Sequence, residues 1–266
     1  MSQATGKLFL IDHDGTLCQT NPFAFESIKY AALDAVNKLG HENKITANDW
    51  DDIFSETSGT TEKNLARFIC NMIGVSLEEF EKHFYSSRAN WFLQMKKSQE
   101  FIFDTYYPDA EFLINKVDAS SDYHLMMVTG NPENVMDVRL STHLRKHFCN
   151  DGDRILGGFG NECFSRQDLI KNAIDDAIEL FPDFVPSKNN FGFYDNVYYI
   201  GDGYKDFKAG IYAKVKTIWI PSRSLPMVKE KSSDEQIKLL MDVLGSNAII
   251  TNNLESKPVL DFIGLN

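Results

Sequence analysis

The sequence has few cysteines, and none of them form a motif. Cys18, Cys70, Cys149 and Cys163 lie far apart, with no C-x-x-C pair among them. Their spacing therefore predicts neither a disulfide framework nor a zinc site. We expect four reduced thiols.

The chain also lacks long apolar runs. The first one, LFLI at residues 8–11, is much shorter than the apolar part of a signal peptide or the roughly 20 residues of a membrane span, and no other run approaches that length. The expectation is a cytoplasmic protein with no membrane partner.

Positive charge is scarce as well. The 27 Lys and Arg residues are outnumbered by 38 Asp and Glu residues, which gives a formal net charge of −11. Such a field repels phosphate backbones, and no local basic patch offsets it. Nucleic acid is therefore not an expected partner.

The composition that remains is that of a folded protein. Hydrophobic residues make up 43% of the 266 residues and aromatic residues 12%, which excludes a disordered chain. A chain of this length suits one large domain or two modest ones, and either can bury a core.

Short apolar runs with β propensity alternate with helical patterns over most of the chain. Strands that alternate with helices predict a parallel sheet covered on both faces. The expected fold is therefore a Rossmann-like, three-layer α/β core. The expected strands are residues 7–11, 124–129, 154–156, 197–201 and 215–220. The expected helices lie at 110–117, near 132–145 and at 167–180, and residues 248–251 and 254–263 close the fold.

A long segment interrupts this alternation. From residue 21 to residue 107 apolar residues recur at helical spacing, with glycines between the helical stretches. We predict an all-helical cap domain over 21–107, inserted into a core domain formed by 1–20 and 108–266. Residues 222–246 are less regular and predict a surface excursion with one helix.

Acidic residues follow the expected strands at their carboxyl ends, where parallel sheets bind ligands. Asp12 and Asp14 follow the first strand, and Asp202 and Asp206 follow the run at 197–201. Carboxylates that converge in a buried place are costly unless a cation lies among them. An all-oxygen ligand set favours Mg²⁺.

The spacing of the first two acids suits phosphoryl transfer. Asp12 can attack phosphorus, and Asp14, two residues later on the same turn, can act as the general acid. That division requires the pKa of Asp14 to be raised, while Asp12 stays ionised.

Three segments resemble motifs of the haloacid dehalogenase superfamily of phosphohydrolases. LFLIDHDGTL at 8–17 resembles the first motif, LMMVTGN at 125–131 the second, and IGDGYKD at 200–206 the fourth. The motifs occur in the family's order and span nearly the whole chain. The position of the cap resembles that of phosphoglycolate phosphatase-like members.

The resemblance implies a role for each residue of the motifs. Asp12 would become an aspartyl-phosphate, Asp14 would protonate the leaving group and then activate water, and Thr129 would bind a phosphoryl oxygen. Mg²⁺ would be held by Asp12, Asp202, Asp206 and the backbone carbonyl of Asp14. The expected substrate-binding residues are Gly15, Thr16, Gly130, Asn131 and Lys171.

The cation of the third motif is ambiguous, because the common Lys-Pro pattern is missing. Residues 157–171 resemble a subgroup with an arginine at the start of this helix, which points to Arg166, and Lys171 is the reserve candidate. An arginine suits the role, since its guanidinium stays charged and can grip phosphate with two hydrogen bonds.

The sequence thus predicts a magnesium-dependent phosphatase for a small phosphorylated metabolite, with a cap that excludes water. A phosphomutase or phosphotransferase on the same fold is the alternative enzyme. A catalytically silent binding protein is the alternative of another class, although no motif acid is missing. His13 is expected to be an exposed turn residue, with a substrate contact as the alternative. Candidate substrate contacts in the cap, which the sequence does not rank, are Phe23, Phe25, Lys63, Arg67 and Arg88.

Overall fold

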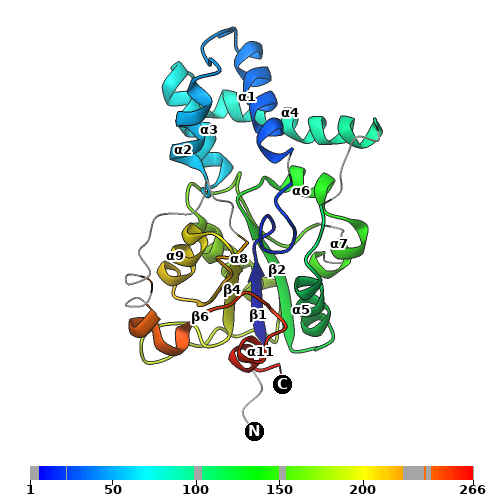
Figure 1. The fold of residues 1–266 in the computed structure, drawn as a ribbon, viewed down its shortest axis with the longest axis vertical. Coiled ribbons are helices and arrows are strands. Elements are labelled where there is room, and N and C mark those ends of the chain that lie inside the picture. The colour runs from blue at the N-terminus through cyan, green and yellow to red at the C-terminus, as the bar shows by residue number, and fades with distance from the viewer. Residues whose placement is uncertain are drawn as a thin grey trace.

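A computed structural model describes residues 6–21, 23–98, 104–149, 154–223, 237 and 241–265. In this part of the chain six strands form one parallel sheet in the order β3-β2-β1-β4-β5-β6 (Figure 1). The central strand β1 pairs with β2 and β4, and its last residue, Ile11, lies between Met127 and Ile200. The strands are β1 (Lys7–Ile11), β2 (Tyr123–Thr129), β3 (Gly157–Phe159), β4 (Val197–Gly201), β5 (Lys216–Trp219) and β6 (Ala248–Ile250).

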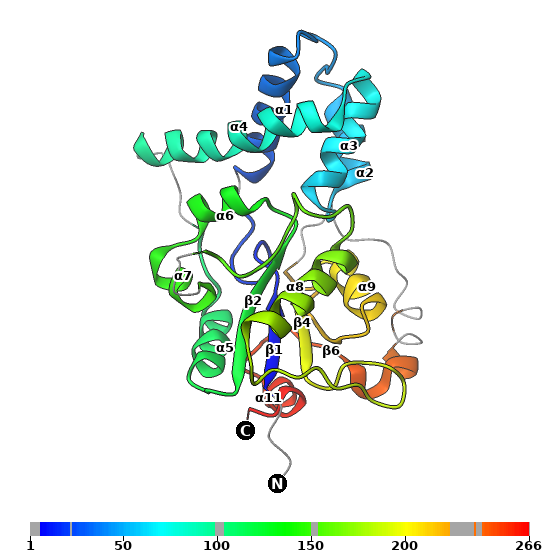
Figure 2. The same ribbon diagram turned by 180° about the vertical axis from the view of Figure 1, so that it is seen from behind.

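Helices cover both faces of this sheet, as Figures 1 and 2 show. Because side chains alternate along a strand, Phe9 of β1 faces one set of helices and Leu10 the other. The first face is covered by α5 (Pro108–Asp118), α7 (Thr142–Phe148) and α11 (Lys257–Ile263), and the second by α8 (Arg166–Leu180) and α9 (Tyr204–Tyr212). The predicted three-layer α/β fold is confirmed.

Four further helices form a separate layer beyond the carboxyl ends of the strands (Figure 1). They bury a hydrophobic cluster of their own, which includes Ala32, Ile53, Ile69 and Phe80. The domain division predicted from the sequence stays a prediction, and this separate cluster is consistent with it. These cap helices are α1 (Ala24–Lys38), α2 (Asp49–Thr57), α3 (Glu62–Ile73) and α4 (Leu77–Lys97).

The cap rests directly on the loops of the core. The backbone N–H of Glu62 donates to the carbonyl of Gly130 (3.1 Å), and that of Lys63 donates to the carbonyl of Gly160 (2.7 Å). Beside them, α4 packs against α6 (Glu133–Arg139) of the core through a small apolar cluster. The cap therefore covers the edge of the sheet where the motif acids lie.

One local expectation needs correction, and another lies outside the described residues. The third strand is β3 at 157–159 and not 154–156. Gly157 and Gly158 pair with Met127 and Val128 of β2, and Gly157 lies so close to the backbone of Met127 that a Cβ would not fit. The helices expected near 132–145 are α6 and α7, with Leu140 extended between them and Ser141 capping the second one. The helix expected within 222–246 falls mostly on residues 224–236 and 238–240, which lie outside the described part of the chain.

Among the described residues, no helix combines the length and the apolar character needed to cross a bilayer.

Candidate active site

The loops that follow β1, β2 and β4 converge on a cavity of about 160 Å³ beneath the cap. Asp12 and Asp14 reach it from the turn after β1, Asn131 from the loop after β2, and Asp202 from the loop after β4. The cap contributes an apolar wall, and one basic residue, Arg88, to the same cavity. Its cap residues include Ala24, Phe25, Ile28, Phe54, Glu62 and Leu65.

Three of the predicted acids form a cluster that fits a divalent cation. Carboxylate oxygens of Asp12, Asp202 and Asp206 all lie within 4.8 Å of one another, and all three residues are buried. Among the described residues, Oδ1 of Asp12 accepts no hydrogen bond. Gly15 makes the approach possible, because its φ is +79° and a Cβ there would lie 2.5 Å from the Asp202 carboxylate. A compact set of buried oxygen acceptors suits Mg²⁺.

Asp206 has additional partners within this cluster. Its Oδ1 accepts a hydrogen bond from the Tyr199 hydroxyl (2.8 Å) and pairs with Nη1 of Arg166 (2.5 Å). Its Oδ2 accepts a hydrogen bond from the backbone N–H of Gly203 at the start of α9 (3.0 Å). These contacts hold Arg166 beside the cluster, and a cation bound by Asp206 would replace one of them.

The site needs more positive charge than the chain supplies around Asp12. Burial raises the pKa of Asp12 to about 8; Arg166 opposes this shift, while the charges of Asp206 and Asp202 add to it. A carboxylate nucleophile must be ionised. A bound divalent cation would favour the ionised form, so the electrostatics agree with the ligand geometry.

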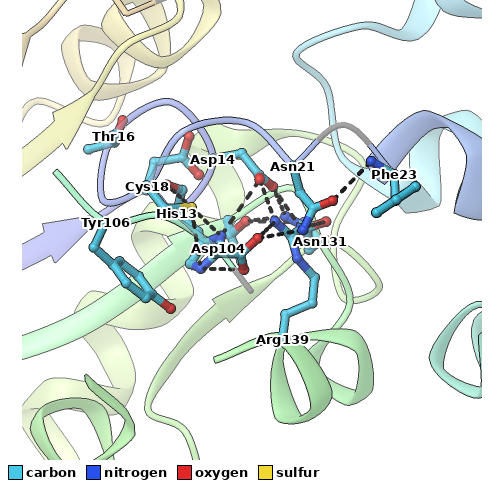
Figure 3. Close-up of polar contacts among 12 residues, drawn as sticks. His13, Asp14, Thr16, Cys18, Asn21, Phe23, Asp104, Tyr106, Asn131 and Arg139 are labelled. Carbon is cyan, nitrogen blue, oxygen red and sulfur yellow. Dashed lines mark hydrogen bonds and ion pairs between the residues drawn. The ribbon is translucent and has the colours of Figure 1, made fainter. Parts of the chain in front are cut away.

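The carboxylate of Asp14 points toward an arginine of the core (Figure 3). Nη1 of Arg139 lies 2.9 Å from Oδ2 of Asp14, and Nη2 lies 2.6 Å from Oδ1. Burial raises the pKa of Asp14, but Arg139 and a hydrogen bond from His13 outweigh it and hold that pKa well below its usual range. The expectation of a raised pKa for Asp14 is wrong in this arrangement, because the sequence did not reveal Arg139.

Arg166 and Lys171 have different positions although both lie on α8. Nη1 of Arg166 lies 3.2 Å from Oδ1 of Asp12, and its Nε donates to the carbonyl of Gly59 in the cap (3.2 Å). Lys171 is half-exposed and pairs with Asp168 (3.6 Å), outside the residues that line the cavity. The structure thus brings Arg166 to the site and leaves Lys171 on the helix surface.

Of the remaining predicted residues, Gly130 and Asn131 line the cavity, and Thr16 and Thr129 are buried beside them. The Thr129 hydroxyl accepts hydrogen bonds from Asn131, at 2.9 Å from Nδ2 and 3.3 Å from the backbone N–H. The Thr16 hydroxyl is buried and donates to Oδ1 of Asp202 (3.3 Å). Gly130 lies so close to the cap that a Cβ would approach the carbonyl of Thr60 to 2.7 Å.

His13 is not the exposed turn residue that the sequence indicated. It is fully buried, with Nδ1 3.8 Å from Oδ1 of Asp14 and Nε2 3.6 Å from Oδ2 of Asp104. The Cys18 sulfur lies 3.6 Å from Nδ1 (Figure 3). A histidine between two acids in the sequence carries no signal of this burial, which depends on the segment returning from the cap.

Two arginines near the site were not assigned from the sequence. Arg139 carried no signal, and Arg88 was one unranked candidate in the cap. Arg88 is buried, forms an ion pair with Glu62, and donates from Nη2 to Oδ1 of Asn131 (3.0 Å). Their importance follows from partners distant in the sequence, up to 125 positions away for Arg139, which a single sequence does not reveal.

No known family model and no curated protein matches the chain. Among solved structures, it is similar to CbbY from Rhodobacter sphaeroides in complex with phosphate, with 13% identity, a TM-score of 0.60, and coverage of 97% of this chain and 100% of the other. It is also similar to a family IA, variant 3 haloacid dehalogenase hydrolase from Entamoeba histolytica HM-1:IMSS (18% identity, TM-score 0.57, 97% and 98% covered). A hydrolase from Pseudomonas syringae has 14% identity and a TM-score of 0.51 over 88% of this chain and 90% of its own. The chain therefore has the fold of the haloacid dehalogenase superfamily.

Proposed function

We propose that this protein is a magnesium-dependent phosphatase that hydrolyses a small phosphorylated metabolite through an aspartyl-phosphate on Asp12. The observation that carries the proposal is the buried cluster of Asp12, Asp202 and Asp206 beside Arg166, with Asp14 on the same turn. The fold supports it, since the similar CbbY structures are complexes with phosphate and with xylulose-(1,5)bisphosphate.

In the first step, a carboxylate oxygen of Asp12 attacks phosphorus and the bond to the leaving oxygen breaks. Arg166 lies 3.2 Å from Asp12 and balances charge on the attacking carboxylate and the transferring phosphoryl group. Asp14 gives to the departing oxygen the proton that it takes from water in the second step of the preceding turnover. The Thr129 hydroxyl and the backbone N–H groups of the loop after β2 would orient the phosphoryl oxygens.

In the second step, Asp14 takes a proton from water, and that water attacks the phosphorus of the aspartyl-phosphate, which releases phosphate and restores Asp12. The pairing of Asp14 with Arg139 keeps Asp14 in the ionised form that this step requires. The cap covers the cavity and would limit water to the molecule that reacts.

The carboxylates of Asp12, Asp202 and Asp206 and the backbone carbonyl of Asp14 would hold Mg²⁺. When bound, the ion supplies positive charge that keeps Asp12 ionised and neutralises the phosphoryl oxygens. The cavity volume of about 160 Å³ under a closed cap favours a small substrate over a phosphoprotein.

The test is a panel of phosphate esters assayed with MgCl₂ and, in parallel, with a chelator. Asp12→Asn is the inactive variant, and Asp175→Asn, an exposed aspartate on α8, is the matched control. We expect phosphate release that requires Mg²⁺, survives in the control and is lost in Asp12→Asn.

Running the same reaction in ¹⁸O-labelled water separates the alternatives. Labelled oxygen in free phosphate supports hydrolysis. Transfer of phosphate to a second hydroxyl without solvent oxygen would instead identify a phosphotransferase or phosphomutase. No turnover across the panel would overturn the proposal in favour of a silent binding protein.

A further inference from the structure

We propose that Arg139 is a positioning residue for Asp14, and that it joins the orientation of Asp14 to the two chain segments that connect the cap with the core. The functional part of this inference rests on the role proposed above for Asp14. The structural part stands on contacts of buried residues and can be tested without any turnover.

Arg139 fixes the plane of the Asp14 carboxylate. Both terminal nitrogens of the guanidinium contact it, each with a different oxygen, at 2.9 and 2.6 Å. Nδ2 of Asn131 donates to the same Oδ2 at 2.8 Å. A planar guanidinium with two parallel hydrogen bonds sets the orientation of a carboxylate, which the single ammonium of a lysine does not do.

Arg139 itself is held rigidly. It is the last residue of α6, its side chain is fully buried, and the guanidinium carbon lies 5.6 Å from the centre of the Phe92 ring of cap helix α4. Its Nη1 also lies 3.3 Å from Oδ1 of Asn131, which accepts a hydrogen bond from Arg88 of α4. The cap thus contacts both groups that orient Asp14.

The same guanidinium contacts the connections between cap and core (Figure 3). Nη2 of Arg139 lies 3.1 Å from Oδ1 of Asp104, in the segment that returns from the cap. That oxygen also accepts a hydrogen bond from Nδ2 of Asn21, in the outgoing segment, at 2.8 Å. One buried carboxylate therefore joins the returning segment, the outgoing segment and the residue that orients Asp14.

The two connecting segments are paired through their backbones as well. Gln19 donates its N–H to the carbonyl of Thr105, and Tyr107 donates to the carbonyl of Leu17, each at 2.9 Å. A movement of the cap against the core must bend this paired segment, because the chain passes through it in both directions. Such a movement displaces Asp104 and, through it, Arg139.

The functional test is a double-mutant cycle between Arg139 and Asp14. Arg139→Gln should lower kcat about 10- to 100-fold, which is part of the contribution that acid–base catalysis typically makes. KM should stay within about threefold, because the interaction acts in the transition state. If Arg139 acts through Asp14, Arg139→Gln should cost almost nothing further in the Asp14→Asn background.

The cycle is measured with an aryl phosphate, whose good leaving group keeps the Asp14→Asn variants measurable. Arg145→Gln is the matched control and should leave kcat unchanged. Arg145 lies on α7, outside the residues that line the cavity, and pairs with Asp137 of α6. Losses that multiply in the double variant would mean that Arg139 only supports the fold, and would overturn the proposal.

Arg139→Lys covers the case in which Arg139→Gln does not fold. It keeps the positive charge that Asp14 and Asp104 require but loses the bidentate hydrogen bonding of the guanidinium. We expect it to fold, as thermal unfolding would show, with a kcat between those of the unmutated protein and Asp14→Asn. Full activity of Arg139→Lys would show that charge alone suffices and would contradict the positioning role.

Asp104→Asn tests the link to the connecting segments. It should lower kcat less than Arg139→Gln does, and the two losses should not multiply; an unchanged kcat would overturn this link. A crystal structure of the most stable Arg139 variant gives a readout independent of activity. A rotated Asp14 carboxylate supports the proposal even if the unmutated protein hydrolyses nothing, and an unmoved carboxylate overturns it.

Discussion

Two aspartates on one turn lie in opposite electrostatic surroundings. Both Asp12 and Asp14 are removed from water, and burial alone raises the pKa of each. Asp12 has two further acids and one arginine around it, so its pKa stays high. Asp14 has Arg139 bound to both of its oxygens, so its pKa falls well below the usual range. Both aspartates are buried, so they differ in how much positive charge the chain itself places beside each of them.

The two aspartates therefore differ in whether they need a bound ion. The carboxylate of Asp14 needs none, because its protein partners both keep it ionised and set its orientation. The cluster around Asp12 has an excess of negative charge, which a divalent cation would offset, so that an anionic phosphoryl group could approach. The predictions below test this contrast, beginning with the largest effect.

Asp12→Asn should remove the reaction. An amide is not a nucleophile toward phosphorus, and enzymes that lose their nucleophile typically lose on the order of 10⁵- to 10⁶-fold in kcat. Steady-state kinetics with MgCl₂ provide the measurement. Turnover within about tenfold of the unmutated protein, a loss too small for a nucleophile, would refute the assignment of Asp12.

Asp14→Asn should lower kcat by about 10²- to 10⁴-fold, the usual range for a lost acid–base group. The loss should be largest for alkyl phosphates, whose leaving oxygens need a proton, and smaller for aryl phosphates. Equal losses for both substrate types would assign Asp14 to a step other than proton transfer to the leaving group.

Arg166→Gln should lower kcat/KM by about 10²- to 10³-fold, as the loss of a preorganised charge contact usually does. Lys171→Gln on the same helix should have no effect on kcat/KM, because Lys171 is half-exposed and pairs only with Asp168 among the contacts described for it. The pair of variants separates the two candidates of the third motif. A loss in Lys171→Gln equal to that in Arg166→Gln would reverse their assignment.

Stability should depend on pH in a way that Mg²⁺ removes. The folded protein holds a proton on Asp12 up to about pH 8, whereas an unfolded chain releases it near 3.8. Without metal, the free energy of unfolding should therefore fall as pH rises from about 4 to about 8. Asp14 has the opposite effect, with stability lost as the pH falls below about 4, because its folded pKa is lowered.

Thermal unfolding between pH 5 and 8 measures this slope in the presence of a chelator and in the presence of MgCl₂. Subtracting the slope of Asp12→Asn isolates the contribution of Asp12 from those of the six histidines. Bound Mg²⁺ should flatten the slope and raise the melting temperature, since a ligand that binds only the folded state stabilises it. Identical slopes in both conditions would contradict the metal site.

The parts of this account that sequence predicts well are the local ones. Buried strands such as 197–201 are continuous apolar runs, and an aspartate after such a run marks the end of a strand. Strand β3 lies after the predicted run because Gly157 fits closely against the backbone of Met127 in β2, a contact that depends on tertiary approach and not on propensity.

The partners of Asp14 could not be predicted for the same reason. Arg139 lies 125 positions from Asp14, and Asp104 lies 83 positions from Asn21. Nothing in the spacing of a lone arginine on a short helix distinguishes it from a surface residue. The acid motifs were visible because their members follow strands, whereas the groups that tune them are brought together only by folding.

The central claim is that the phosphoryl group passes to Asp12. Asp14→Asn, which lacks the base for the second step, should accumulate the intermediate when it is given an aryl phosphate labelled with ³²P. Rapid acid quenching and peptide mapping should then locate the label on the peptide that contains Asp12. Label on any other residue, or turnover without labelled protein at any time, would contradict the account.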